Sequence, residues 1–153
     1  MEIRRAREAD IGDLCRVVRA SIVELCVADH RGDPDILARW LANKTPQNVS
    51  AWLANTRNIN LVADEGGAVL AAGCVTVSGE IVLNYVSPTA RFRGVTTKLL
   101  AAMEDCARRL GVERCTLDST ETARRFYERR GCRGVADAGA KHGMTNYPMA
   151  KDL

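Results

Sequence analysis

The stretch that decides the fold runs from Val86 to Leu100 and reads VSPTARFRGVTTKLL. An apolar run, Ile81–Val86, precedes it and is typical of a buried strand that ends at a proline. After Gly94, apolar residues recur at helical spacing: Leu99, Leu100, Met103, Ala107 and Leu110. We therefore expect a strand, a short basic loop and a helix N-terminus in direct succession. The first N–H groups of a helix lack partners within the helix, so this arrangement predicts a phosphate site.

The loop offers consecutive candidates for phosphate contact: Arg91, Phe92, Arg93, Gly94, Val95, Thr96 and Thr97. Gly94 has no side chain, so the backbone can approach a ligand closely there. The chain contains neither the Gly-x-x-x-x-Gly-Lys-[Ser/Thr] pattern of a nucleotide P-loop nor the Gly-x-Gly-x-x-Gly fingerprint of dinucleotide sites. Taken alone, the loop leaves open a basic helix N-terminus that binds nothing.

The pattern Arg91-x-x-Gly94-x-Thr96 resembles the acetyl-coenzyme A loop of the GNAT superfamily of N-acetyltransferases. The family's usual form is Gln/Arg-x-x-Gly-x-Gly/Ala, so Thr96 is a departure. A later segment resembles the family's Asn-x-x-Ala-x-x-Phe-Tyr-x-x-x-Gly motif through four matches: Ala123, Phe126, Tyr127 and Gly131. Thr120 replaces the Asn of that motif. The resemblance covers about residues 59–150 and a first strand near residues 2–5, and it leaves residues 30–56 unmatched.

The resemblance implies an α/β (α+β) fold with a mixed, mostly antiparallel central sheet flanked by helices. Local patterns give strands at 2–6, 58–63, 68–77, 80–86, 114–118, 133–136 and 145–150. They give helices at 11–25, from 33, from 45, from 95 and over 119–130, with a loop at 28–32. We expect one domain, 1–153, with a helical insert on the acceptor side at about 30–56.

Composition favours an ordinary globular protein: 153 residues, 46% hydrophobic and 27% charged. No apolar stretch approaches a membrane span, and the N-terminus does not resemble a signal peptide. The cysteines form no Cys-x-x-Cys pair, so we expect reduced thiols, a cytoplasmic protein and no metal site.

Charge is distributed unevenly along the chain. Residues 1–90 carry 9 Lys and Arg against 11 Asp and Glu, a net charge of −2. Residues 91–133 carry 11 against 6, a net charge of +5. The basic part includes the phosphate loop and suits a ligand with a pyrophosphate and a ribose phosphate, the alternative being a solvated basic face. No stripe of interleaved aromatic and basic residues points to nucleic acid.

The resemblance also implies roles around the thioester. Tyr127 becomes the candidate general acid at the sulfur, the alternative being a core aromatic. Tyr85 and Val86 become candidates for pairing with the pantetheine arm, with the Val86 N–H as oxyanion donor. The resemblance also makes Thr120, Ala123 and Phe126 candidates for binding the coenzyme. Asn84 is unusual in an apolar strand, and either marks a bulge or contacts substrate.

The acceptor side is less clearly marked. Glu80 opens the same strand and is a candidate base acting through water, or merely an exposed turn residue. Glu24, Asp29, His30 and Lys44 lie near helix ends, where sites concentrate. A carboxylate there attracts a cationic amine, and an imidazole titrates near neutrality. Asp33 is expected to cap a helix and Trp40 to lie in the core, while His142 and Tyr147 are further candidates for the acceptor mouth.

These patterns predict an N-acetyltransferase that moves an acetyl group from acetyl-coenzyme A to a primary amine of a small molecule, by direct attack in a ternary complex. A cysteine acyl-enzyme is not expected, because no Cys is paired with a His in sequence context. Two alternatives remain: a protein lysine or N-terminal acetyltransferase, and a non-catalytic acyl-coenzyme A sensor. The chain is expected to act as a monomer or homodimer, without nucleic acid or membrane.

Overall fold

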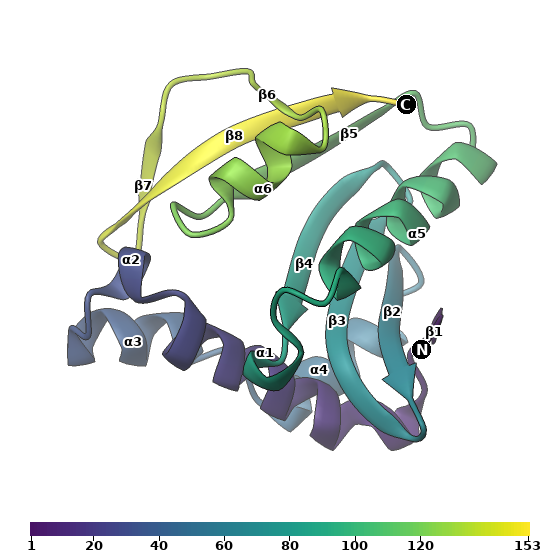
Figure 1. Cartoon of the computed structure of the whole chain (residues 1–153), viewed down its shortest axis with the longest axis horizontal. Coiled ribbons are helices and arrows are strands. Elements are labelled where there is room, and N and C mark those ends of the chain that lie inside the picture. Colours follow the sequence, from purple (N-terminus) through teal and green to yellow (C-terminus); the bar gives the residue numbers. More distant parts are fainter.

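The computed structural model describes all residues, 1–153, and its centre is a sheet with the strand order β1-β2-β3-β4-β5-β8-β6, to which β7 adds by pairing with β8 (Figure 1). The strands are β1 Glu2–Arg5, β2 Asn58–Glu65, β3 Ala68–Thr76, β4 Glu80–Val86, β5 Arg114–Ser119, β6 Arg133–Gly134, β7 Gly139–Lys141 and β8 Met144–Asp152. Only β4 and β5 pair in parallel, and every other pair is antiparallel. The predicted mixed, mostly antiparallel sheet is confirmed.

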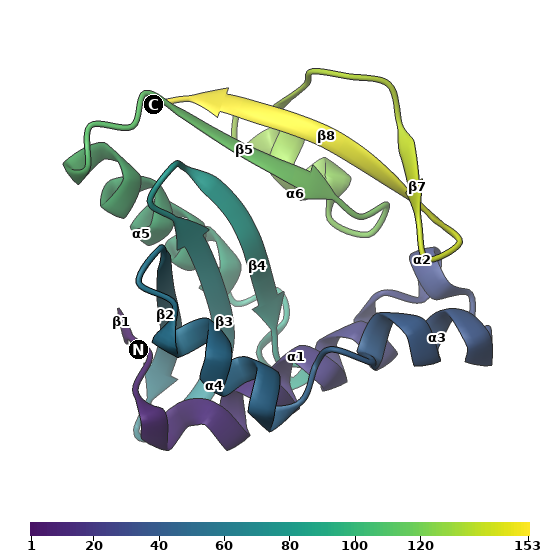
Figure 2. The same ribbon diagram turned by 180° about the vertical axis from the view of Figure 1, so that it is seen from behind.

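Helices cover both faces of this sheet (Figures 1 and 2). They are α1 Ile11–Leu25, α2 Val27–His30, α3 Pro34–Leu41, α4 Pro46–Ala54, α5 Val95–Arg109 and α6 Arg124–Arg129, with 3-10 turns at Glu8–Asp10 and Pro88–Ala90. Two hydrophobic cores lie on opposite faces of the sheet, and alternate residues of β2 belong to each. Leu61 packs in the core beside α5, and Val62 packs in the core beside α1. No helix combines the length and apolar character that a bilayer span requires.

Two helix starts follow the expected capping chemistry. The Asp33 carboxylate accepts hydrogen bonds from the N–H groups of Asp35 and Ile36 ahead of α3. The Thr45 hydroxyl accepts one from the N–H of Asn48 ahead of α4. A proline follows each cap at the first helical position, where its missing N–H costs nothing.

Three local expectations were wrong. Residues 27–30 form the single turn α2 instead of a loop, because one turn is too short to show a period. The helix expected over 119–130 is α6, Arg124–Arg129, and a turn precedes it. The strand expected over 133–136 is reduced to Arg133–Gly134, whereas β7, which has no apolar alternation, was not expected.

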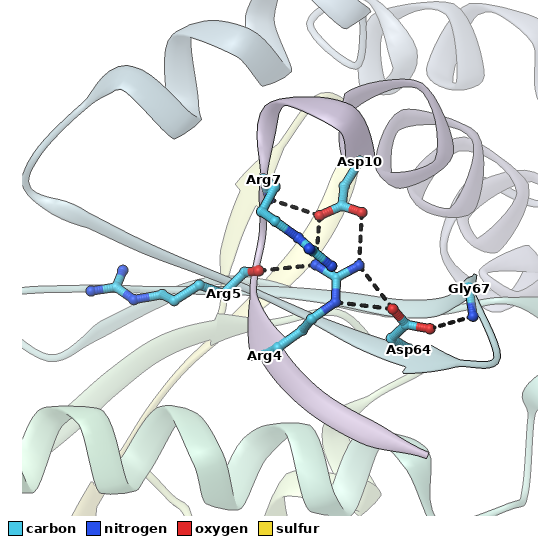
Figure 3. Close-up of polar contacts among 6 residues, drawn as sticks. All are labelled: Arg4, Arg5, Arg7, Asp10, Asp64 and Gly67. Carbon is cyan, nitrogen blue, oxygen red and sulfur yellow. Dashed lines mark hydrogen bonds and ion pairs between the residues drawn. The ribbon is translucent and has the colours of Figure 1, made fainter.

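A partly buried ion cluster fastens β1 to the sheet (Figure 3). Arg4 donates to both carboxylate oxygens of Asp10, at 2.7 and 2.9 Å, and from Nε to Asp64 at 3.0 Å. Asp64 also accepts from the Gly67 N–H at 2.8 Å, which closes the β2–β3 turn. The hydrogen bond from Arg4 lowers the pKa of Asp10, and the Gly67 N–H and Arg4 lower the pKa of Asp64. This cluster holds the N-terminus far from the β4–β5 boundary.

The sheet opens between β4 and β5. Only Glu80 and Ile81 pair with β5, opposite Thr116 and Leu117, and the strands then diverge (Figures 1 and 2). A β-bulge lies at the same place, because Val82 has no partner in β3. The extra residue reverses the faces of the strand: Ile81 packs on the α5 side, and after the bulge Val86 does so.

Candidate functional site

Two clefts border the separation between β4 and β5, one on each face of the sheet. The α5-side cleft, of about 480 Å³, lies between the start of α5, the end of β4, α6 and the C-terminal end of α1. The α3-side cleft, of about 230 Å³, lies between β4, β5, the end of α3 and the β7–β8 turn. Tyr85 and Thr120 line both, so the clefts meet where the strands separate.

The α5-side cleft gathers nearly all the residues expected to hold a coenzyme: Tyr85, Val86, Arg91, Phe92, Gly94, Val95, Thr96, Thr97, Thr120, Ala123 and Phe126. Tyr127, the candidate general acid, lines the same cleft. The side chain of Arg93 is the exception. Its guanidinium contacts both carboxylate oxygens of Glu65 at 2.9 Å and so points to the β2–β3 turn. Glu65 lies 28 residues before Arg93 in the chain, so the sequence alone does not predict this contact.

The backbone of the loop opens the start of α5 to the cleft. Gly94 is the N-cap residue with φ 75°, in the left-handed region that favours glycine, and no side chain caps the helix. A Cβ atom at Gly94 would meet nothing within 4 Å, so the space beside it is free. The first N–H groups of α5 therefore remain available to an anion.

Arginines of α6 and the residues after it add positive charge that the sequence interpretation left as a solvated face. Arg125, Arg129 and Arg130 line the α5-side cleft. Arg130 donates to the Thr97 hydroxyl at 2.8 Å, and its guanidinium lies 5.0 Å from the centre of the Phe126 ring. The buried Nε of Arg130 has no partner. The repeated Arg-Arg pairs flanking Phe126-Tyr127 were the available signal.

Tyr127 and Asn84 form the polar centre of the α5-side cleft. Tyr127 is only 6% exposed, and Asn84 Nδ2 donates to its hydroxyl oxygen at 3.2 Å. Burial raises the pKa of Tyr127 to about 12, so the phenol keeps its proton at neutral pH. Because Asn84 supplies a donor, the phenol proton is free for another acceptor.

The N–H of Val86 points into the gap between the strands. The neighbouring Ser87 N–H donates to Leu70 O on β3 at 2.7 Å. Backbone groups of successive residues point to opposite edges of a strand, so the Val86 N–H faces away from β3. This is the edge of β4 that β5 leaves unpaired.

The substrate candidates near α2 have structural partners. Asp29 lines the α3-side cleft, but its carboxylate accepts from the N–H groups of Glu121 and Thr122, at 2.8 and 3.1 Å, and from the Thr122 hydroxyl. His30 is 2% exposed; Nε2 contacts Ile22 O at 3.0 Å, and Nδ1 accepts from the Gly32 N–H. Both ring nitrogens are thus engaged, which favours a structural histidine over a base.

Glu24 is exposed and lines neither cleft. Glu80 lines the α3-side cleft, together with His142 and Trp40. Asp118 and Lys141 line the same cleft and were not singled out from sequence. Asp118 was part of a predicted strand, and Lys141 was near no recognised motif. Only the fold shows that both residues line one cleft.

Comparisons with known proteins agree with this geometry. The family model for the acetyltransferase (GNAT) domain matches residues 28–153. A GCN5-related N-acetyltransferase from Rhodopseudomonas palustris has a similar structure: TM-score 0.88, 24% identity, 99% of this chain and 95% of that chain covered. The PaiA N-acetyltransferase from Thermoplasma acidophilum, solved in complex with coenzyme A, also has a similar structure. Its TM-score is 0.84 at 17% identity, and the match covers 99% of this chain and 98% of that chain.

A ribosomal-protein-alanine N-acetyltransferase from Brucella melitensis also matches, with a TM-score of 0.77, 21% identity and 100% of both chains covered. Curated proteins give no match. The structural similarities, all below 25% identity, establish the fold, and the family model covers most of the sequence, including both motifs. The chain belongs to the acetyltransferase (GNAT) domain family.

Proposed function

We propose that this protein is an N-acetyltransferase that transfers the acetyl group of acetyl-coenzyme A to a primary amine of a small molecule. The observation that carries the proposal is the pair of clefts on opposite faces of the sheet, which meet at Tyr85 and Thr120. Two substrates can enter from opposite sides and react in the gap between β4 and β5. This supports direct attack in a ternary complex.

Acetyl-coenzyme A is assigned to the α5-side cleft. Its pyrophosphate would contact the free N–H groups at the start of α5, and Arg91 and Arg130 would add positive charge. The pantetheine arm would pair with the open edge of β4 as an added strand. The coenzyme A complex of the similar PaiA enzyme supports this choice of ligand.

The chemistry follows from the positions of three groups. The amine nitrogen attacks the thioester carbonyl carbon, and the Val86 N–H stabilises the resulting oxyanion. The carbon–sulfur bond then breaks, and Tyr127 gives its proton to the sulfur. Glu80, on the acceptor side, takes the amine proton through water. Solvent then returns a proton to Tyr127 and takes the proton from Glu80, so that in the net reaction one proton moves from the amine nitrogen to the sulfur.

Cys26 lines the α5-side cleft but does not suit an acyl-enzyme route. Burial, with the charge of Asp29, raises the pKa of its thiol to about 12. A thiol that stays protonated at neutral pH is a poor nucleophile. We therefore infer direct transfer without a cysteine intermediate.

Residues 1–153 are proposed to act as one domain, a monomer or homodimer, with α2–α4 forming the acceptor-side insert. All six cysteines are free, which fits a reducing compartment such as the cytoplasm.

The test is coenzyme A release from acetyl-coenzyme A with a panel of small amines, and in parallel with lysine-containing and free N-terminal peptides. Turnover with small amines and not with peptides supports the proposal. Preference for peptides would place the chain among protein acetyltransferases. Tight acetyl-coenzyme A binding without release by any amine would indicate a sensor module.

A further inference from the structure

The α3-side cleft carries charges of both signs on separate walls. Glu80 and Asp118 come from β4 and β5, and both lie on the sheet face opposite α5. Lys44 comes from the turn after α3, and Lys141 from the end of β7. None of these four side chains forms an ion pair within the protein. The cleft is therefore polarised between an acidic and a basic wall.

The two lysines lie close enough to affect each other. Lys44 donates from Nζ to Asn43 Oδ1 at 2.7 Å, and no carboxylate balances its charge. Partial burial, with the positive charge of Lys141, lowers the pKa of Lys44 to about 8. A negatively charged group between the two ammonium groups would relieve this repulsion. Asp29, the remaining carboxylate of the cleft, is already bound by the turn before α6.

We propose that the acceptor is a small amine that also carries a carboxylate, as an amino acid does, with the carboxylate bound between Lys44 and Lys141 and the amine held near Glu80 and Asp118. This substrate class rests on the acetyl transfer proposed above. A polyamine or other polycation would place positive charge against the lysine wall, so such acceptors are disfavoured. The cleft volume of about 230 Å³ suits a molecule of amino-acid size.

The first experiment compares amines that differ only by one carboxylate: lysine with cadaverine, ornithine with putrescine, and phenylalanine with phenethylamine. At saturating acetyl-coenzyme A, at least one carboxylated member should have a kcat/KM about 10-fold or more above its partner. Lys44→Met and Lys141→Met should each remove that preference mainly through KM, and Lys44→Arg should retain it. Lys98→Met, an exposed lysine on α5 outside both clefts, is the matched control and should leave the ratio unchanged.

Equal rates for both members of every pair, or a preference for the decarboxylated amines, would overturn the substrate class while leaving acetyl transfer intact. A preference that survives both Lys→Met variants would overturn the assigned subsite.

A binding measurement separates these outcomes from failure of the proposed activity. Calorimetry with the coenzyme A complex should show N-acetyl-lysine binding at least about 10-fold tighter than N-acetyl-cadaverine, and Lys44→Met should abolish the difference. This readout needs no turnover, so it tests the carboxylate subsite even if no amine is acetylated. Equal affinities, or no binding of either compound, would contradict the inference.

Discussion

The two clefts beside the β4–β5 separation are built differently. The α5-side cleft is formed largely by two continuous segments, the end of β4 through the start of α5 and the turn through α6. The α3-side cleft takes its charged groups from five separate segments: α2, the turn after α3, β4, β5 and the end of β7. One surface thus depends on backbone geometry and adjacent residues, whereas the other depends on the fold bringing distant residues together. Coenzyme binding is therefore tied to local sequence, and acceptor choice can change through single substitutions.

Gly94→Glu should have the largest effect and should act on the α5-side cleft alone. It places a carboxylate where the pyrophosphate is expected, and like charges in contact cost several kcal/mol, so acetyl-coenzyme A affinity should fall by about 100-fold or more. Calorimetry measures the loss. Gly111→Glu is the matched control, because Gly111 has φ 80° and open space like Gly94, but lies outside both clefts. If the control loses affinity equally, backbone strain explains the effect.

Tyr127→Phe should lower kcat by about 100-fold with little change in acetyl-coenzyme A affinity, since it removes one proton donor. Single-turnover rates measure the chemical step directly. Because the pKa of Tyr127 is about 12, the wild-type rate should show no alkaline loss from this group below about pH 10. A full single-turnover rate in the variant would remove Tyr127 from the mechanism.

Glu80→Gln probes the α3-side cleft and should reduce kcat/KM for the amine by about 10-fold, a modest effect because water and the amine's own ionisation partly replace the base. The deficit should be greatest at low pH, where the amine is hardest to deprotonate. Glu113→Gln, at an exposed carboxylate outside both clefts, serves as the control. Identical pH profiles for wild type and Glu80→Gln would show that Glu80 only faces solvent.

Arg4→Met should leave both clefts unaffected and lower only stability. It leaves the buried Asp10 carboxylate and that of Asp64 without their cation, so the Tm should fall by several degrees at pH 7 while kcat/KM stays unchanged. Arg5→Met is the control, since Arg5 contributes only its backbone carbonyl to the cluster (Figure 3).

The difference in Tm between wild type and Arg4→Met should depend on pH in one direction. The folded pKa values of Asp10 and Asp64 are lowered, so their stabilisation is complete above the unfolded pKa and is lost as pH falls through the folded values. The gap in Tm between wild type and Arg4→Met should therefore shrink below about pH 4. A gap that is constant with pH would mean that packing, not charge, explains the loss.

The contrast between the clefts also explains what the sequence could predict. The strand–loop–helix at Gly94 was predictable because residues adjacent in the sequence determine it. The helix caps at Asp33 and Thr45 were predictable for the same reason. The partners of His30 and Arg93 were not predictable, since these side chains contact residues that only the fold brings near. The site roles of Tyr127, Glu80 and Val86 remain predictions.

The lysines of the α3-side cleft show the same limit. Lys44 and Lys141 lie far apart in the chain, in segments without a recognisable motif, and only the β7–β8 turn brings them to one wall. No spacing rule relates them.

The unpaired residue in β4 makes its position the place where the length of this strand can vary. Val82 is 45% exposed and without a partner in β3, so many side chains should be tolerated at this position. The residues on either side of Val82 pair with consecutive residues of β3, so its deletion would close the ladder without a bulge and without a change of register. Asn84 would keep its contact with Tyr127, and Tyr85 would stay on the α1 side. Position 82 should therefore accept deletion as well as substitution.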